Sequence, residues 1–110
     1  MTEIEFAQLA DELMLSVEDA IEDSGLDIDY ESAGGVLTLT IEAENSKVII
    51  SRQPAMYQIW LAARSGGFHL SYHDQNWRCT TTGETFETLL NRVCREQGTG
   101  EQRVFDHSNG

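Results

Sequence analysis

The sequence predicts an α+β fold: a two-layer α-β sandwich in which an antiparallel meander sheet of about six strands carries N- and C-terminal helices on one face. Apolar residues recur at helical spacing near both ends of the 110-residue chain. Between these regions, short stretches alternate apolar and polar residues, which is typical of half-buried strands. Short turns join the stretches, so neighbouring strands should run antiparallel. Two helices can cover only one face of such a sheet, and the other face should meet water.

The first element is expected to be a helix that begins after Thr2. Thr2 followed three residues later by Glu5 has the form of a capping box, and Gly25 is expected to end the helix. The apolar residues of this segment form one stripe at helical spacing: Phe6, Leu9, Ala10, Leu13, Val17, Ala20 and Ile21. This stripe predicts the side of the helix that packs on the sheet.

Strands are expected over residues 26–31, 36–42, 47–52, 56–63, 68–72 and 77–80, with glycine pairs at 34–35 and 66–67 as turns. In the second of these strands Leu37, Leu39 and Ile41 should face the core. Helical spacing returns over residues 86–93, and Gly98 is a candidate for the end of that helix. The expected domain is therefore residues 1–97, and residues 98–110 form a short polar tail in which Val104 and Phe105 can pack on the core.

The composition excludes several classes of protein. Forty per cent apolar residues with two Trp, three Tyr and four Phe indicate a folded chain and not an acidic disordered one. No apolar run approaches the roughly 20 residues that a bilayer crossing requires, and the acidic start is neither a signal nor a transit peptide. Two cysteines are too few for a disulfide framework, so a reducing cytoplasm is the expected location.

Charge is distributed very unevenly along the chain. The net charge is -12, and the first 46 residues hold thirteen carboxylates and no lysine or arginine. From Lys47 onward acids and bases are nearly balanced. Such a chain repels nucleic acid and anionic lipid, so its expected partners are cations, either metal ions or a basic patch on another protein.

The acids form a candidate site, with an ordinary solvated surface as the alternative. On a helical wheel they make two neighbouring rows, and the first strand then points three further acids to one side: Asp11, Glu18 and Glu22; Glu12, Asp19 and Asp23; Asp27, Asp29 and Glu31. Like charges at helical spacing cost roughly 0.2–0.5 kcal/mol per pair. A face selected only for solubility would interleave lysines. The two sets are therefore expected to merge into one acidic ridge that attracts something positive.

Carboxylate oxygens are hard ligands, which suit Fe²⁺ or Fe³⁺, Mn²⁺, Mg²⁺ and Ca²⁺. An EF-hand loop is excluded, because Ser32 stands where that loop needs glycine and Thr38 where it needs glutamate. An exposed row of acids without an enclosing loop predicts weak, multiple and poorly selective sites.

No enzymatic site is supported by the remaining residues. His69, His73 and His107 lack metal-ligand spacing with the cysteines or with one another, and no nucleophile lies in a recognisable arrangement with a base. A ferroxidase would require a fixed carboxylate or histidine cage that this pattern does not show. The expected protein is not an enzyme.

Trp60 is a second candidate for partner binding. If Ile59 and Leu61 face the helices, strand parity places Gln58 and Trp60 on the uncovered face. An exposed Trp there is a good anchor for a partner protein, and Arg52 is expected close by as a charged contact. A Trp shielded by its own cross-strand neighbours fits the pattern equally well.

Several segments together resemble the frataxin family. Arg52-Gln53-Pro54, Gln58-Ile59-Trp60-Leu61-Ala62 and Gly66-Gly67-Phe68 are similar to its central signature. The segments from Glu5-Phe6 to Leu9-Ala10-Asp11, Gly34-Gly35-Val36-Leu37-Thr38 and Gly83-Glu84-Thr85-Phe86 resemble its bacterial, CyaY-type branch. The resemblance extends to about Glu96 and is specific in combination.

The resemblance implies an α-β sandwich, iron binding on an acidic ridge and a role in iron–sulfur cluster assembly. On the matching positions the metal ridge would be Glu18, Asp19, Glu22, Asp23, Asp27, Asp29 and Glu31. The acidic surface, with Asp11 and Glu12, would bind the cysteine desulfurase, and Trp60 would contact the scaffold protein. The leading hypothesis is a monomeric iron donor, or an iron-dependent regulator of the desulfurase and scaffold complex. The alternative is an acidic docking module whose metal binding is incidental.

Overall fold

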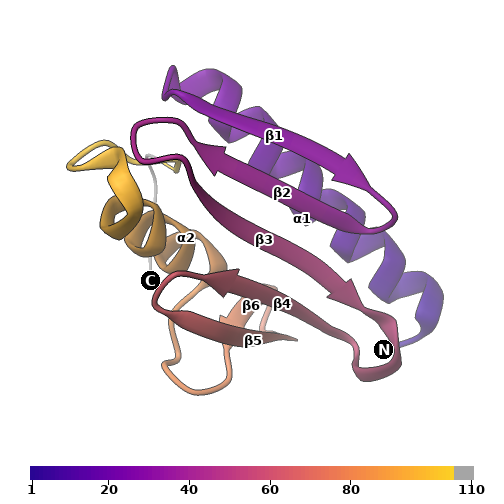
Figure 1. Cartoon of the computed structure of the whole chain (residues 1–110). Coiled ribbons are helices and arrows are strands. Elements are labelled where there is room, and N and C mark those ends of the chain that lie inside the picture. The colour runs from indigo at the N-terminus through magenta and orange to yellow at the C-terminus, as the bar shows by residue number, and fades with distance from the viewer. Residues whose placement is uncertain (106–110) are drawn as a thin grey trace.

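The computed structural model describes residues 1–105, and the last part of the expected tail, with His107, lies outside the described residues. The chain runs from one helix through six strands to a second helix (Figure 1). The elements are α1 (Glu3–Ser24), β1 (Ile28–Ala33), β2 (Val36–Ile41), β3 (Ser46–Gln53), η1 (Pro54–Met56), β4 (Gln58–Ala63), β5 (Gly66–His73), β6 (Asn76–Cys79), α2 (Phe86–Cys94) and η2 (Arg95–Thr99).

The six strands form one antiparallel sheet in the order β1-β2-β3-β4-β5-β6. Both helices pack on the same face of this sheet, so the predicted two-layer sandwich is confirmed (Figure 1). Neither helix of the described chain combines the length and the apolar composition that a membrane crossing requires.

The core lies between the two layers. Helix α1 begins with the predicted capping box, in which the Glu5 N–H donates to Thr2 Oγ1 (3.1 Å) and the Thr2 N–H donates to Glu5 Oε1 (2.9 Å). Gly25 ends the helix in the left-handed conformation, as expected. The predicted stripe of α1 is buried or half-buried, together with Met14, and it meets Leu37, Leu39 and Ile41 of β2.

Some element boundaries differ from expectation for local reasons. β4 begins at Gln58 and not at residue 56, because Pro54 starts a short 3₁₀ turn and Tyr57 follows with a left-handed φ of 53°. α2 ends at Cys94, and Gly98 lies inside the π-helical turn that follows, with a φ of 135°. Gly98 therefore interrupts the turn and does not cap α2.

The segment after this turn returns to the core. Val104 is buried, and the Phe105 ring meets the Phe86 ring edge-on with 6.5 Å between centroids. The Asn91 side chain binds both the N–H and the carbonyl oxygen of Phe105, each at 2.9 Å. The expected packing of Val104 and Phe105 on the core is thus confirmed.

Candidate functional site: the acidic α1–β1 side

The acids of α1 approach the edge strand around Tyr30. The Tyr30 hydroxyl donates to Glu22 Oε1 at 2.5 Å, which joins β1 to the last turns of α1. This hydrogen bond, with the negative charges of Glu18 and Asp19, raises the pKa of Tyr30 to about 12. The structure therefore brings Glu18, Asp19 and Glu22 together beside one phenol, and the sequence alone gave no signal for the role of Tyr30.

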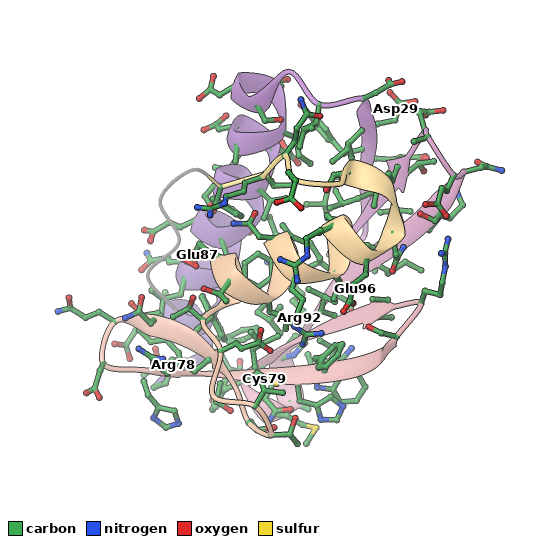
Figure 2. All side chains as sticks on the ribbon, turned by 90° about the vertical axis from the view of Figure 1, so that its left-hand side faces the viewer. Asp29, Arg78, Cys79, Glu87, Arg92 and Glu96 are labelled. Carbon is green, nitrogen blue, oxygen red and sulfur yellow. The ribbon has the colours of Figure 1, made fainter. Side chains whose placement is uncertain are left out.

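The strand acids lie on the other side of the edge strand. Because Ile28 and Tyr30 point toward the helices, Asp29 and Glu31 point to the uncovered face, where they line a shallow groove with Thr38, Thr40 and Lys47. In Figure 2 Asp29 stands at the far side of β1 from the helices. The helix acids and the strand acids thus flank the edge of β1 from its two faces, instead of forming one row on one face.

Glu42 joins the strand acids and was missing from the predicted metal set. The β1–β2 pairing places the chain after Ile41 opposite Asp27, and the Glu42 N–H donates to the Asp27 carbonyl oxygen at 3.1 Å. A side-chain hydrogen bond with Asp29, followed by the negative charges of Asp29 and Asp27, raises the pKa of Glu42. Pairing the first two predicted strands outward from their glycine turn would have indicated this contact.

The remaining predicted ridge residues are solvent-facing. Glu12, Asp23 and Asp27 are exposed, while Asp11 forms an ion pair with Arg52 at 2.6 Å. Within residues 1–105, no three carboxylate, imidazole or thiol side chains converge in a group that could hold a metal ion. The donors present are hard, exposed carboxylate oxygens, a set that suits cations which keep much of their water and make one or two carboxylate contacts.

Arg52 does not share a surface with Trp60, contrary to expectation. Its cross-strand partner is the buried Ile59, so its side chain lies on the helix side of the sheet, where it reaches Asp11 of α1. Trp60 pairs with Ser51 and points the other way. The sequence prediction failed because two residues adjacent in sequence, Ser51 and Arg52, necessarily point to opposite faces of β3.

Trp60 lies on the uncovered face, as predicted, and is held there by two neighbours. Its ring stacks on His69 of β5 with 4.4 Å between centroids and 7° between planes. Its Nε1–H donates to Gln58 Oε1 at 2.9 Å. The ring is half-buried, so it is both available on the open face and shielded on one side by a cross-strand neighbour.

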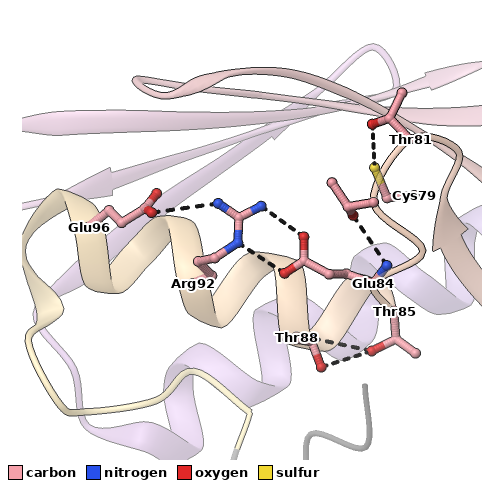
Figure 3. Close-up of polar contacts among 8 residues, drawn as sticks. Cys79, Thr81, Glu84, Thr85, Thr88, Arg92 and Glu96 are labelled. Atoms are coloured by element: carbon pink, nitrogen blue, oxygen red, sulfur yellow. Dashed lines mark hydrogen bonds and ion pairs between the residues drawn. The ribbon is translucent and has the colours of Figure 1, made fainter.

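The third polar cluster of the chain lies at α2. Arg92 donates from Nε and Nη2 to the two carboxylate oxygens of Glu84, at 2.9 and 2.8 Å, and its Nη1 lies 3.5 Å from Glu96 (Figure 3). The ion pair with Arg92 lowers the pKa of Glu84. The guanidinium also lies over the Phe68 ring, 5.5 Å from its centroid. The ion pairs join α2 to the segments before and after it, and the contact with Phe68 joins α2 to β5. Because both carboxylates are paired with Arg92, this cluster is a structural contact and not a candidate metal site.

Comparison with known proteins places the chain among relatives of one family. A family model described as "Frataxin-like domain" matches residues 1–100. The "Iron-sulfur cluster assembly protein CyaY" of Pseudomonas paraeruginosa (strain DSM 24068 / PA7) is 49% identical over 107 residues, which cover 96% of this chain and 97% of that protein. The protein of the same name from Stutzerimonas stutzeri (strain A1501) is 46% identical over 108 residues, with 96% of each chain covered.

Solved structures show the same fold. The frataxin from Psychromonas ingrahamii superposes with a TM-score of 0.87 at 37% identity, over 96% of this chain and all of that one. A trimeric frataxin from Saccharomyces cerevisiae, complexed with ferrous iron, superposes with a TM-score of 0.65 at 28% identity, over 88% and 86% of the two chains. With a sequence match over most of its length and the helix–six strands–helix architecture described above, this chain belongs to the frataxin family.

Proposed function

We propose that this protein is a non-enzymatic, iron-binding component of iron–sulfur cluster assembly in the cytoplasm, which acts as a monomer on the cysteine desulfurase and its scaffold protein. The observation that carries the proposal is the acidic α1–β1 side, defined as Glu18, Asp19, Glu22, Asp23, Asp27, Asp29, Glu31 and Glu42. The names of the relatives, which refer to iron–sulfur cluster assembly, and the ferrous complex of the yeast neighbour support it.

Iron is the cargo in this proposal, and the chain supplies exposed carboxylates to hold it. Oxygen donors that stay hydrated bind Fe²⁺ weakly and at several places, because no enclosing set of ligands excludes water. Weak binding allows release to a partner. It also lets the protein respond to changes in iron concentration, as a regulator of the desulfurase would need to do.

Anaerobic Fe²⁺ titration of the isotope-labelled protein tests the iron site. We expect the NMR signals of Glu18, Asp19, Glu22 and Asp29 to broaden first, while the Trp60 indole signal persists to higher iron. Early broadening at His69 and His73 would instead place the metal on β5, away from the acidic α1–β1 side, and reject the acidic site.

A charge-matched pair of variants tests the docking surface. One variant carries Glu18→Gln, Asp19→Asn and Glu22→Gln. The control carries Asp74→Asn, Glu87→Gln and Glu101→Gln and has the same net charge. We expect the first to bind the desulfurase complex at least tenfold more weakly at low salt, and the control to bind as the parent does. Equal losses in both variants would show that only net charge matters.

Two rates distinguish an iron donor from an iron-dependent regulator: desulfurase turnover and cluster formation on the scaffold. Both are measured over a range of Fe²⁺ concentrations. A regulator changes sulfide release in proportion to iron. A donor leaves sulfide release unchanged and accelerates cluster formation. If the protein changes neither rate, the proposal is rejected.

A second candidate function is an acidic docking module for which metal binding is incidental. The lack of a converging three-residue metal group among residues 1–105 favours it. Under this hypothesis, the effect on the desulfurase would be the same with and without iron, and binding would weaken steeply with salt.

A further inference from the structure

A groove lies between the middle of α1 and the turn that joins β1 to β2. Figure 1 shows this turn beside the helix. The groove has a volume of about 630 Å³, and its lining includes Met14, Leu15, Val36 and Arg52. Gly35 has a left-handed φ of 80° and packs closely on Arg52, since a Cβ at that position would lie 3.0 Å from Arg52 Cγ.

The groove has an apolar wall that the fold itself does not use. Leu15 is 58% exposed and Val36 is 36% exposed, while Met14 beneath them is buried. The packing stripe of α1 runs along the other side of the helix. Leu15 is thus an exposed aliphatic side chain in the middle of an acidic helix face, and it shares one groove with the exposed Val36.

The rim of the groove is acidic. Asp11 lies one turn before Leu15 and Glu18 lies one turn after it, and both line the groove. The one base in the lining, Arg52, is already bound to Asp11 at 2.6 Å, and its Nε is buried. Because Arg52 neutralises Asp11, Glu18 leaves the rim with a net negative charge. An apolar centre beside such a carboxylate is complementary to an aliphatic side chain flanked by lysine or arginine.

We propose that this groove anchors the partner protein, by taking an aliphatic side chain that basic residues flank on the partner surface. The inference rests on the docking role proposed above and adds a defined anchor to it. A second copy of the chain does not fit, because it would bring another net charge of -12 against the same rim. An anionic lipid surface does not fit for the same reason.

The groove lies at the glycine-turn end of β1, whereas Asp29 and Glu42 lie at the other end of that strand, in the first hairpin. The partner is held at the groove end, beside the exposed leucine and valine side chains.

The test compares Leu15→Ser with Ile4→Ser, using the purified desulfurase complex as the probe. Ile4 lies on the same helix and is 72% exposed, so it is a matched control outside the groove. Both side chains face solvent, so both variants should fold. A thermal unfolding curve that matches that of the parent would verify this for each variant. We expect Leu15→Ser to weaken binding about tenfold, the loss that follows from not burying the exposed half of a leucine side chain. Ile4→Ser should bind within twofold of the parent.

Salt dependence adds a second readout. Leu15→Ser should weaken binding by a similar factor at every salt concentration, because the lost contact is apolar. The Glu18, Asp19 and Glu22 neutralisation should instead flatten the salt dependence.

The outcomes separate the anchor from the docking role. If Leu15→Ser binds as the parent does while the acid variant loses affinity, the anchor is wrong and the docking role stands. If Leu15→Ser and Ile4→Ser lose equally, the anchor is also overturned. If the parent protein itself does not bind the complex, both proposals fail.

Discussion

Glu42 and Asp29 are two carboxyl groups that share a side-chain hydrogen bond. The hydrogen bond with Asp29 and the charges of Asp29 and Asp27 raise the pKa of Glu42, so the folded protein holds a proton there more tightly than the unfolded chain does. When both groups ionise, they repel each other. A cation that replaces the proton relieves this repulsion.

Glu42→Gln is expected to stabilise the protein increasingly as pH rises. Because the pKa of Glu42 is higher in the folded protein than in the unfolded chain, protonated Glu42 adds to the free energy of unfolding at low pH. This stabilisation is lost as pH rises through the folded pKa. Glutamine keeps the uncharged form at every pH. The melting temperature of Glu42→Gln should therefore approach that of the parent as pH falls toward 4 and exceed it by pH 7, which lies well above the ordinary glutamate pKa of about 4.3.

Melting curves across this range check the expectation, with Glu101→Gln as the control. Glu101 is exposed and lies outside the first hairpin. The change in melting temperature caused by Glu101→Gln should therefore not follow the pH dependence expected for Glu42→Gln. A lower melting temperature for Glu42→Gln at pH 7 would mean that the pair is stabilising and already neutralised.

The two side-chain contacts of these acids differ in how far the sequence predicts them. The Glu42–Asp29 contact follows from pairing the first two expected strands outward from their glycine turn, although the predicted metal set lacked Glu42. The Tyr30–Glu22 contact does not, because it requires α1 and β1 to meet at one angle. Acid content and hairpin pairing are local properties, whereas a contact between α1 and β1 is a consequence of tertiary packing.

At the scale of elements, the segment after α2 is fastened by one buried amide. Gln97 is 1% exposed, accepts from the Arg64 N–H at 2.7 Å and donates to the Lys47 carbonyl oxygen at 3.0 Å. Ser46 Oγ in turn donates to the main-chain carbonyl oxygen of Gln97 at 2.9 Å. The π-helical turn Arg95–Thr99 is thus tied to the start of β3 and to the turn after β4.

Gln97→Ala is expected to destabilise the fold by about 2–4 kcal/mol, since it removes two hydrogen bonds to buried or half-buried backbone groups and leaves a cavity. Chemical denaturation would show this as a lower midpoint with an unchanged slope. Gln102→Ala is the control, because Gln102 is exposed and the substitution should change stability by less than about 0.5 kcal/mol. Equal stability of Gln97→Ala and the parent would show that the turn does not secure the sheet.

The helices and strands themselves were predictable because their signals are local. Helical spacing at Phe86, Leu89, Leu90 and Val93 and the alternation of Leu37, Leu39 and Ile41 need no knowledge of distant residues. The π-helical turn was not predictable, because Gln97 gains its partners about fifty residues away along the chain. Strand alternation alone places Arg52 on the opposite face of β3 from Ser51 and Trp60, but its contact with Asp11 follows from how β3 and α1 meet.

For the whole molecule, the main property is a charge separation that the fold leaves largely uncompensated. The ion pairs of the described chain join Arg52 to Asp11, Arg64 to Glu44, and Arg92 to Glu84 and Glu96. Of these, only the Arg52–Asp11 pair involves an acid of α1. The unequal distribution was evident in the sequence, since the first 46 residues lack any base. The division of these acids between the two faces of β1 became visible only in the structure.

This charge separation predicts that cations stabilise the protein, and that divalent cations do so beyond their ionic strength. Like-charged neighbours on α1, such as Glu18 with Glu22 and Asp19 with Asp23, each cost roughly 0.2–0.5 kcal/mol, and salt screens that repulsion. Relief of several pairs amounts to about 1 kcal/mol, which corresponds to a rise of roughly 4–8 °C in melting temperature for a domain of this size.

Thermal unfolding in NaCl and in MgCl₂ at equal ionic strength measures the two effects separately. Sodium should raise the melting temperature by screening alone, and magnesium should raise it further, because a divalent ion can bridge carboxylates such as Asp29 and Glu42. Glu42→Gln should lose most of the extra magnesium effect and keep the sodium effect, since it removes one bridging carboxylate and leaves the general field intact. The charge-matched control with Asp74, Glu87 and Glu101 neutralised should keep both effects. A melting temperature that falls with added salt would show that the carboxylates already form attractive contacts within the folded protein. The acidic side would then have no unpaired carboxylate available to bind a cation.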